Sequence, residues 1–201
     1  MTDAAKCEAG ITLTVLTDPD PLNPITEFDQ TGRMACWHRR YRLGHEQPDT
    51  DPQEWRDALP EDALVLPLYL LDHSGITMST KPFSCPWDSG QVGWIWASVG
   101  DIQRAFMVDE ITEDVEERAR QLLIAEVAEY DRYLRGDVWM FQVTGKDGSV
   151  LDACGGFPSF DDALQEGNGV FAACVTEARA RDAAGLARDI AETRPDLAPA
   201  T

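Results

Sequence analysis

The fold is decided by the stretch ALVLPLYLLDHSGITMSTKPFSCPWDSGQVGWIWAS, residues 63–98. Its first part, 63–73, is a nearly continuous apolar run that predicts a buried strand, and Pro67 within it indicates an edge position or a bulge. A glycine turn then makes ITMST, 76–80, the expected hairpin partner, and VGWIWAS, 92–98, predicts a further strand. This stretch therefore predicts antiparallel strands, with a loop before the last of them.

Similar patterns continue on both sides of this stretch. Further strands are predicted at 11–17, 34–38, 137–144 and 149–157, and helices at 99–107, 112–135 and 169–193. Paired strands and a separate group of helices predict an α+β fold, with an antiparallel sheet and helices packed on one face. We expect one domain over 1–201, with flexible tails at 1–10 and 194–201.

Charge excludes several functions for the chain. Its 201 residues include 36 Asp and Glu against 17 Lys and Arg, which gives a formal net charge of −19. This balance argues against direct binding of nucleic acid or of an anionic membrane, because both require a basic patch. There is no basic, apolar leader, and the five cysteines are scattered, so we expect a cytoplasmic protein with reduced thiols.

The loop after the first buried strand contains the residues most suited to catalysis. Asp72, His73 and Ser74 are consecutive, so in a strand they point to alternate faces and cannot converge as a triad. A better arrangement pairs Cys85 with His73, while Asp88 or Asp72 orients the imidazole. The simpler interpretation is a structural loop whose Cys and His are hydrogen-bonded and partly buried.

A metal site has weaker support in the sequence. Cys36 and His38 are two residues apart and would share one side of a strand, and His45, His73 and Cys85 are further potential ligands. No standard zinc spacing is present, so we expect no metal and no cofactor, with Cys36 and His38 packed in the strand. The nearby cluster Arg39, Arg40 and Arg42 is interpreted as an ion-pair partner for the acidic stretches, or as a binder of phosphate or carboxylate.

Two stretches concentrate the acidic residues. The first lies at a predicted helix start, where the helix dipole favours negative charge; it contains Asp109, Glu110, Glu113, Asp114, Glu116 and Glu117. The second contains Asp49, Asp51, Glu54, Asp57, Glu61 and Asp62. Either these side chains only solubilise the protein, or they form a surface that imitates DNA phosphates and binds a basic protein partner.

Four segments together resemble one family of proteins. The segments are GRMACWHRRYRLG (32–44), LPLYLLDHSGITMST (66–80), FSCPWDSGQVGWIW (83–96) and YDRYLRGDVWMF (130–141). With the motifs DHSGITMST and FSCPWDSGQVG, they resemble a family of uncharacterised proteins associated with phages and plasmids. The resemblance covers about residues 11–157 and implies an intracellular accessory protein of mobile elements, a setting in which small acidic proteins often inhibit host defence.

Two functional hypotheses follow from these observations. The first is a non-enzymatic acidic protein that binds a basic partner, such as a nucleic-acid-binding defence nuclease, through residues 109–117. The second is a small enzyme or metal-binding protein that uses His73, Cys85, Asp88 and Asp72. Of the six tryptophans we expect most in the core and Trp87 exposed.

Overall fold

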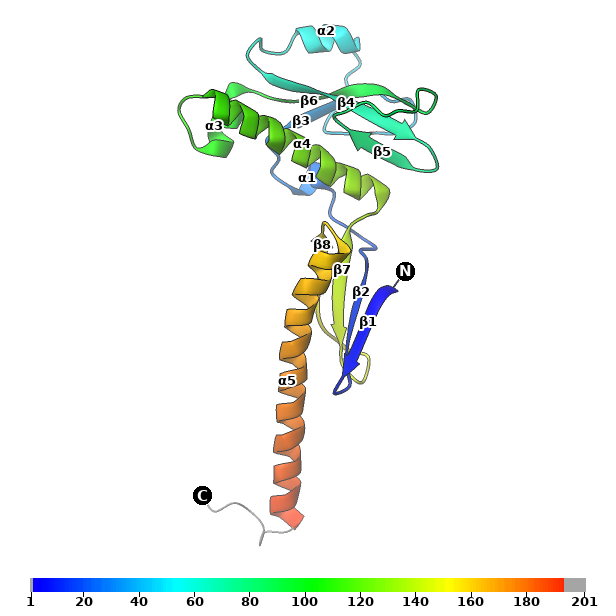
Figure 1. The fold of residues 1–201 in the computed structure, drawn as a ribbon, viewed down its shortest axis with the longest axis vertical. Helices are drawn as coiled ribbons and strands as arrows, with labels where there is room; N and C mark the ends of the chain where they lie inside the picture. Colours follow the sequence, from blue (N-terminus) through cyan, green and yellow to red (C-terminus); the bar gives the residue numbers. More distant parts are fainter. Residues whose placement is uncertain (1, 194–201) are drawn as a thin grey trace. The chain divides into compact units, whose positions relative to one another are not determined.

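Two antiparallel four-stranded sheets organise the chain, and a long helix packs on each of them (Figure 1). The computed structural model describes residues 2–193. The chain divides into two compact units: unit 1 combines residues 1–21 with 137–201, and unit 2 comprises residues 22–136. Each unit has a hydrophobic core of its own.

Unit 1 contains the sheet β1-β2-β7-β8 and helix α5. The elements are β1 (Thr2–Glu8), β2 (Ile11–Thr17), β7 (Trp139–Thr144), β8 (Val150–Phe157) and α5 (Phe160–Thr193). Alternate residues of β2 and β7 are buried with apolar residues of α5 in the core, which comprises Ile11, Leu13, Val15, Phe141, Val143, Ala163, Phe171 and Val175. This alternation is what a sheet with a single covered face requires.

The first strand of unit 1 corrects the prediction of a flexible tail at 1–10. Residues Thr2–Glu8 form β1, which pairs antiparallel with β2. The connecting residues Ala9 and Gly10 both have positive φ, of 52° and 75°. Two consecutive residues of this kind make the tight turn whose twist matches a hairpin. The predicted tail at 194–201 lies outside the described residues.

Unit 2 contains the sheet β3-β6-β4-β5, in which every neighbouring pair is antiparallel. Its strands are β3 (Arg33–Cys36), β4 (Leu64–Asp72), β5 (Ile76–Ser79) and β6 (Ser89–Ala97). Its helices are α1 (Pro24–Glu27), α2 (Pro52–Asp57), α3 (Val99–Phe106) and α4 (Glu113–Arg135). Figure 1 shows α4 on one side of this sheet and α2 on the other.

Helix α4 forms because its local signals agree with its packing. The Thr112 side chain caps its start, and Gly136, with φ of 65°, ends it in the left-handed conformation. Its buried apolar side chains recur at helical spacing and pack with alternate residues of the sheet. They are Val115, Ala119, Leu123, Val127 and Tyr130.

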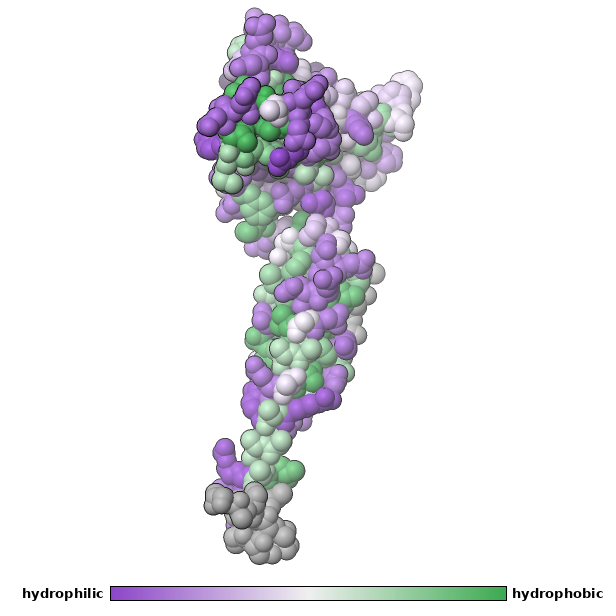
Figure 2. Space-filling model, turned by 60° about the vertical axis from the view of Figure 1, so that its left-hand side comes forward, coloured by the Kyte–Doolittle hydropathy of each residue, from purple (hydrophilic) through white to green (hydrophobic). Residues whose placement is uncertain are grey.

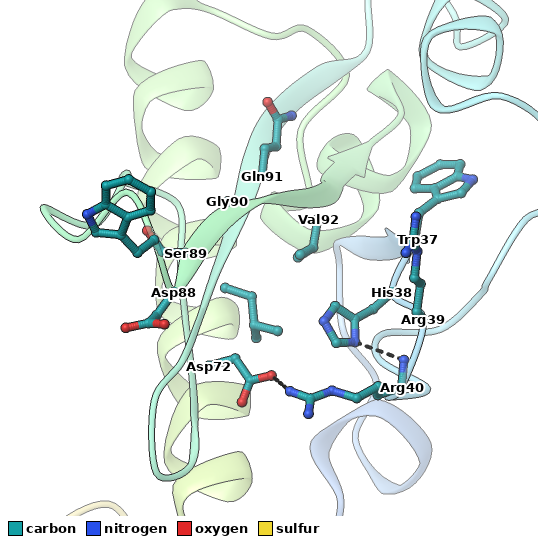
Figure 3. A pocket seen from close by; sticks show the side chains of 12 residues that line it. Trp37, His38, Arg39, Arg40, Asp72, Asp88, Ser89, Gly90, Gln91 and Val92 are labelled. Atoms are coloured by element: carbon teal, nitrogen blue, oxygen red, sulfur yellow. Dashed lines mark hydrogen bonds and ion pairs between the residues drawn. The ribbon is translucent and has the colours of Figure 1, made fainter.

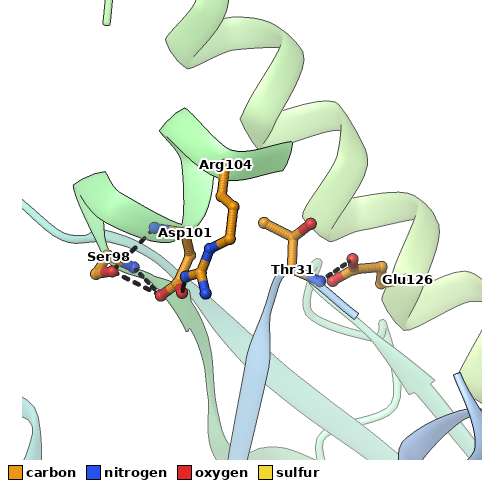
Figure 4. A network of polar contacts seen from close by, with 5 residues as sticks. All are labelled: Thr31, Ser98, Asp101, Arg104 and Glu126. Atoms are coloured by element: carbon orange, nitrogen blue, oxygen red, sulfur yellow. Dashed lines mark hydrogen bonds and ion pairs between the residues drawn. The ribbon is translucent and has the colours of Figure 1, made fainter. Parts of the chain in front are cut away.

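One buried charge ties α4 to the start of β3. Glu126 is 7% exposed, and its two oxygens accept backbone N–H bonds from Thr31 at 2.7 Å and Gly32 at 2.8 Å (Figure 4). Burial raises the pKa of Glu126, although the two hydrogen bonds oppose the rise. Beside it, Ser98 and Asp101 form the capping box that starts α3, with Arg104 paired to Asp101 at 2.5 Å.

The mixed α+β class and the antiparallel pairing are confirmed, whereas a single domain is not. The chain has two sheets instead of one, and the pairing of β2 with β7 joins segments that unit 2 separates in the sequence. Several element boundaries also differ from prediction: the strand expected at 34–38 ends at Cys36, β6 begins at Ser89 instead of residue 92, and α5 begins at Phe160 instead of residue 169.

None of the helices within residues 2–193 has an apolar segment long enough to cross a bilayer.

Candidate functional site

A pocket of about 590 Å³ lies in unit 2, where the end of β4 and the start of β6 meet the loop after β3 (Figure 3). Its lining includes Trp37, His38, Arg40, Asp72 and Asp88. The pocket therefore combines aromatic rings with charges of both signs.

The Arg40 side chain reaches across this pocket to pair with Asp72 (Figure 3). Tyr41 donates from its hydroxyl to the same carboxylate at 3.4 Å, and its ring stacks on His38 with centroids 4.9 Å apart. His38 Nδ1 accepts the backbone N–H groups of Arg40 at 3.3 Å and Tyr41 at 3.2 Å. These bonds fix the loop, so His38 holds the turn that presents Arg40.

The arginine cluster thus pairs differently from the prediction. Arg40 does pair with a carboxylate, but its partner Asp72 belongs to neither acidic stretch. Arg42 donates to the side chain of Gln47 at 3.3 Å, and Arg39 is exposed. The expected neutralisation of the acidic stretches by this cluster is wrong within the described residues.

Asp88 contacts both His73 and Cys85, whereas the sequence predicted that Cys85 pairs with His73 directly. The Oδ2 atom of Asp88 lies 3.2 Å from His73 Nδ1 and accepts the Cys85 thiol at 3.5 Å. Ser89 secures the loop by donating to the Cys85 carbonyl at 2.5 Å. Asp72, the alternative orienting residue, contacts Arg40 instead.

The geometry of this cluster is poorly suited to nucleophilic catalysis. The polar partner of the Cys85 thiol is a carboxylate, while a reactive thiolate requires a basic or cationic neighbour. The His73 side chain is 71% exposed, and neither His73 nor Cys85 lines the pocket that contains Asp72 and Asp88. The four predicted catalytic residues therefore share a region without sharing one cavity.

The two candidate metal ligands, Cys36 and His38, lie in different environments. Cys36 is fully buried in the core of unit 2, where burial raises the pKa of its thiol to about 12. His38 lies beyond the end of β3 and lines the pocket, so strand alternation does not place it beside Cys36. His45 accepts the backbone N–H of Met34 at 2.9 Å. Within residues 2–193 no three His, Cys, Asp or Glu side chains form a group able to hold a metal ion.

The acidic stretch 109–117 is partly neutralised by its own helix. Arg118 lies 3.8 Å from Asp114, and Arg120 lies 3.1 Å from Glu116 and 3.6 Å from Glu117. The other three carboxylates, Asp109, Glu110 and Glu113, are exposed and make no ion pair with any described residue. Half of this predicted binding surface therefore has a local cationic partner.

The acidic residues of the second stretch have no cationic partner among the described residues. All six of its acidic residues are exposed, and none forms an ion pair within the described part of the chain: Asp49, Asp51, Glu54, Asp57, Glu61 and Asp62. Asp51 caps α2 by accepting from Gln53 N at 2.9 Å, and Asp57 accepts from the Gln53 side chain at 2.8 Å. Carboxylates without an ion pair are thus concentrated around α2, where Arg56 is the single basic residue of the stretch 49–62.

A group of four tryptophans beside α2 was missed by the sequence analysis. Trp37, Trp55, Trp94 and Trp96 are half-buried and lie edge-to-face or stacked, with ring centroids 5.4 to 6.5 Å apart. Their signal in the sequence was the alternation of Trp94 and Trp96, which share one face of β6. Trp87 is 91% exposed, as predicted.

No protein-family model matches the chain, and no curated protein and no solved structure matches it either. The resemblance to proteins of phages and plasmids therefore stays a prediction.

Proposed function

We propose that this protein is a non-enzymatic binding protein whose acidic unit 2 engages a basic protein partner. The observation that carries the proposal is the set of exposed carboxylates at 49–62 that have no ion pair within the described residues. Their charges are available to a partner, because no neighbouring arginine of the described chain already satisfies them. Complementary charge accelerates association and selects against partners of the wrong sign.

The partner class follows from the sign and density of this charge. A nucleic-acid-binding protein carries a basic face suited to phosphates, and carboxylates in comparable number compete for the same face. We propose a defence nuclease as the partner, in keeping with the resemblance to mobile-element proteins. The three unpaired carboxylates Asp109, Glu110 and Glu113 extend the acidic surface on α4 and on the loop before it.

A nuclease assay tests this proposal. DNA cleavage by each member of a panel of purified restriction and other defence nucleases is measured with increasing amounts of the protein. We expect inhibition of at least one nuclease, weakening about tenfold between about 50 mM and 300 mM NaCl, because exposed ionic contacts are screened. Absence of inhibition across the panel, or inhibition that salt leaves unchanged, contradicts the proposal.

A second candidate function rests on the contacts of Asp88 with His73 and Cys85. If these residues form a nucleophile site, Cys85 should react with iodoacetamide at about pH 7 at least about tenfold faster than free cysteine. His73→Ala should then abolish the excess rate while the fold is retained. The binding proposal instead expects an ordinary thiol rate that His73→Ala leaves unchanged.

A further inference from the structure

The outer face of the unit 2 sheet, opposite α4, is unusually apolar. On β4 the residues between the buried leucines are Val65, Pro67, Tyr69 and Leu71, all half-buried. An antiparallel sheet with one face in the core normally presents polar side chains on the other face. Figure 2 shows hydrophobic residues reaching the surface of unit 2 among hydrophilic ones. These side chains are only partly covered, so they offer apolar area that a partner could bury.

Three tryptophans from different elements concentrate at one part of this face. Trp37 follows β3, Trp55 lies in α2 and Trp94 lies in β6, and their ring centroids are 5.4 to 6.1 Å apart. No residue of α2 is fully buried, so its packing on the sheet depends on the half-buried Trp55. The rings are therefore fixed against one another while part of each stays accessible.

A groove of about 440 Å³ opens beside these rings. Trp37 and Trp94 line it with Val92, while Asp51 and Gln53 line it from α2 and its cap. Gly93 allows this arrangement, because a Cβ atom there would overlap the carbonyl oxygen of Ala35 on β3. Trp37 donates its indole N–H to the Thr50 carbonyl at 2.9 Å.

Within the described residues the indole N–H of Trp94 makes no hydrogen bond, and unlike that of Trp96 it is not a buried donor without a partner. It is thus a donor available to a carbonyl of a bound chain. Gln53 and Gln91 add amide groups to the lining of the same groove. Side chains of this kind bind the backbone of an extended peptide.

Charge complementarity selects the occupant of the groove. Asp51 lines it, and Glu54 and Asp57 follow on the exposed surface of α2 without cationic partners among the described residues. Aromatic rings also stack on nucleic-acid bases, but these carboxylates repel phosphate. A guanidinium group suits both the tryptophan rings and the carboxylates, since it stacks on an indole face and pairs with a carboxylate.

We infer that this groove, named here the Trp37–Trp94 groove, binds an extended, arginine-containing peptide segment of the partner protein. The inference rests on the proposed function and specifies where and how the basic partner is held. The arginine lies over a tryptophan ring within reach of Asp51, and its backbone accepts a hydrogen bond from Trp94.

The experiment uses the whole protein and a synthetic peptide of about ten residues in which arginine alternates with proline, an extended basic chain. Indole N–H signals are followed by NMR during titration, after assignment by single Trp→Phe variants. We expect the signals of Trp37, Trp55 and Trp94 to shift, and that of Trp139 in unit 1 to stay in place. A matched lysine peptide should bind about threefold to tenfold more weakly, because an ammonium group does not stack as a plane.

Two variants with equal loss of charge separate the groove from general electrostatic attraction. The triple variant Asp51→Asn, Glu54→Gln, Asp57→Asn removes charge at the groove, while asparagine keeps the helix cap. The matched control is Asp152→Asn, Asp161→Asn, Glu166→Gln, which removes three exposed carboxylates of unit 1 that the proposed function does not use. We expect a loss of peptide affinity of about tenfold or more for the first and less than about threefold for the second.

The outcomes separate failure of the Trp37–Trp94 groove from failure of the proposed function. Equal losses in both variants with unmoved indole signals overturn the groove, whereas the proposed binding of a basic partner stands. Absence of binding by the arginine peptide, together with absence of nuclease inhibition, overturns both. Indole shifts caused by a single-stranded DNA oligonucleotide, in preference to the peptide, overturn the inference in favour of a nucleic-acid site.

Discussion

The two faces of the unit 2 sheet use the same strands for different purposes. On the face toward α4, alternate residues of β4 such as Leu68 are fully buried. On the opposite face, Val65, Pro67 and Leu71 are half-buried, and the first two pair with Trp96 and Trp94 of β6. The comparison teaches that β4 is apolar on both faces for two reasons: one face stabilises the fold, and the other is available to a partner.

The largest expected difference between the faces concerns stability. Leu68→Ala should lower the free energy of unfolding by about 3 kcal/mol, because it leaves a cavity in a closed core. Leu71→Ala, the same chemical change on the outer face, should cost about 1 kcal/mol, since less area leaves water on folding. Urea unfolding of both variants measures the difference. Equal costs would mean that the outer face is a second core and no binding surface.

Thiol reactivity gives the next largest contrast. Cys36 faces the core, where burial raises its pKa to about 12, whereas Cys85 lies in a partly exposed loop. We expect iodoacetamide to modify Cys36 about 100-fold more slowly than Cys85 in the native protein, because the thiolate is the reacting form. Peptide mapping by mass spectrometry measures both rates. In urea the two rates should converge, and comparable rates in the native protein would contradict burial of Cys36.

A substitution at Glu126 measures how much its two hydrogen bonds between α4 and the start of β3 contribute to stability. Glu126→Gln should lower the free energy of unfolding by about 1 kcal/mol at neutral pH, because an amide oxygen accepts only one of the two backbone N–H bonds.

The pH dependence of the same variant has a definite sign. Burial raises the pKa of Glu126 in the folded state, so the folded protein keeps this proton to higher pH than the unfolded chain. The contribution of Glu126 to stability is greatest below the ordinary glutamate pKa and declines as the pH rises through the raised value. The stability difference between wild type and Glu126→Gln should decline over this window. A difference that grows with pH would show that the hydrogen bonds outweigh burial.

The smallest contrast compares the helix caps on the two faces. Thr112→Ala removes the cap of α4 and should lower the free energy of unfolding by about 1 kcal/mol. Asp51→Ala removes the cap of α2 and should lower it by less than about 0.5 kcal/mol, because α2 has no fully buried residue and can fray locally. Thermal unfolding measures both, and a larger effect at Asp51 would contradict the peripheral role of α2.

Local signals predicted most elements of the chain. The helices predicted at 99–107 and 112–135 match α3 and α4 closely, and the caps Ser98 and Thr112 and the stop Gly136 bound them. Each is a short-range effect in which a side chain satisfies backbone groups a few residues away. Pro67 was predicted at an edge or a bulge, and it lies where β4 pairs with β6 alone, next to a register shift after Leu68.

The candidate site was predicted only in part. The convergence of His73 and Cys85 on Asp88 follows from their closeness in one loop and its flanking strand ends. The pairing of Arg40 with Asp72 joins two distant segments, and the grouping of Trp37, Trp55 and Trp94 joins three. Neither leaves a local pattern, and the apolar outer positions of β4 were indistinguishable from core positions.

By itself the sequence determined the charge, the antiparallel strands, the helix boundaries set by caps and the loop that holds Cys85. These depend on composition and on contacts between near neighbours. Only the tertiary structure decided that the sheets are two and that β2 pairs with β7 across the whole of unit 2. It also decided that arginines pair with three acids at the start of α4, whereas the described residues give the acids around α2 no ion pair. The physical reason is that strand pairing and surface charge balance depend on which distant segments meet in space, and this is set by packing instead of by local preference.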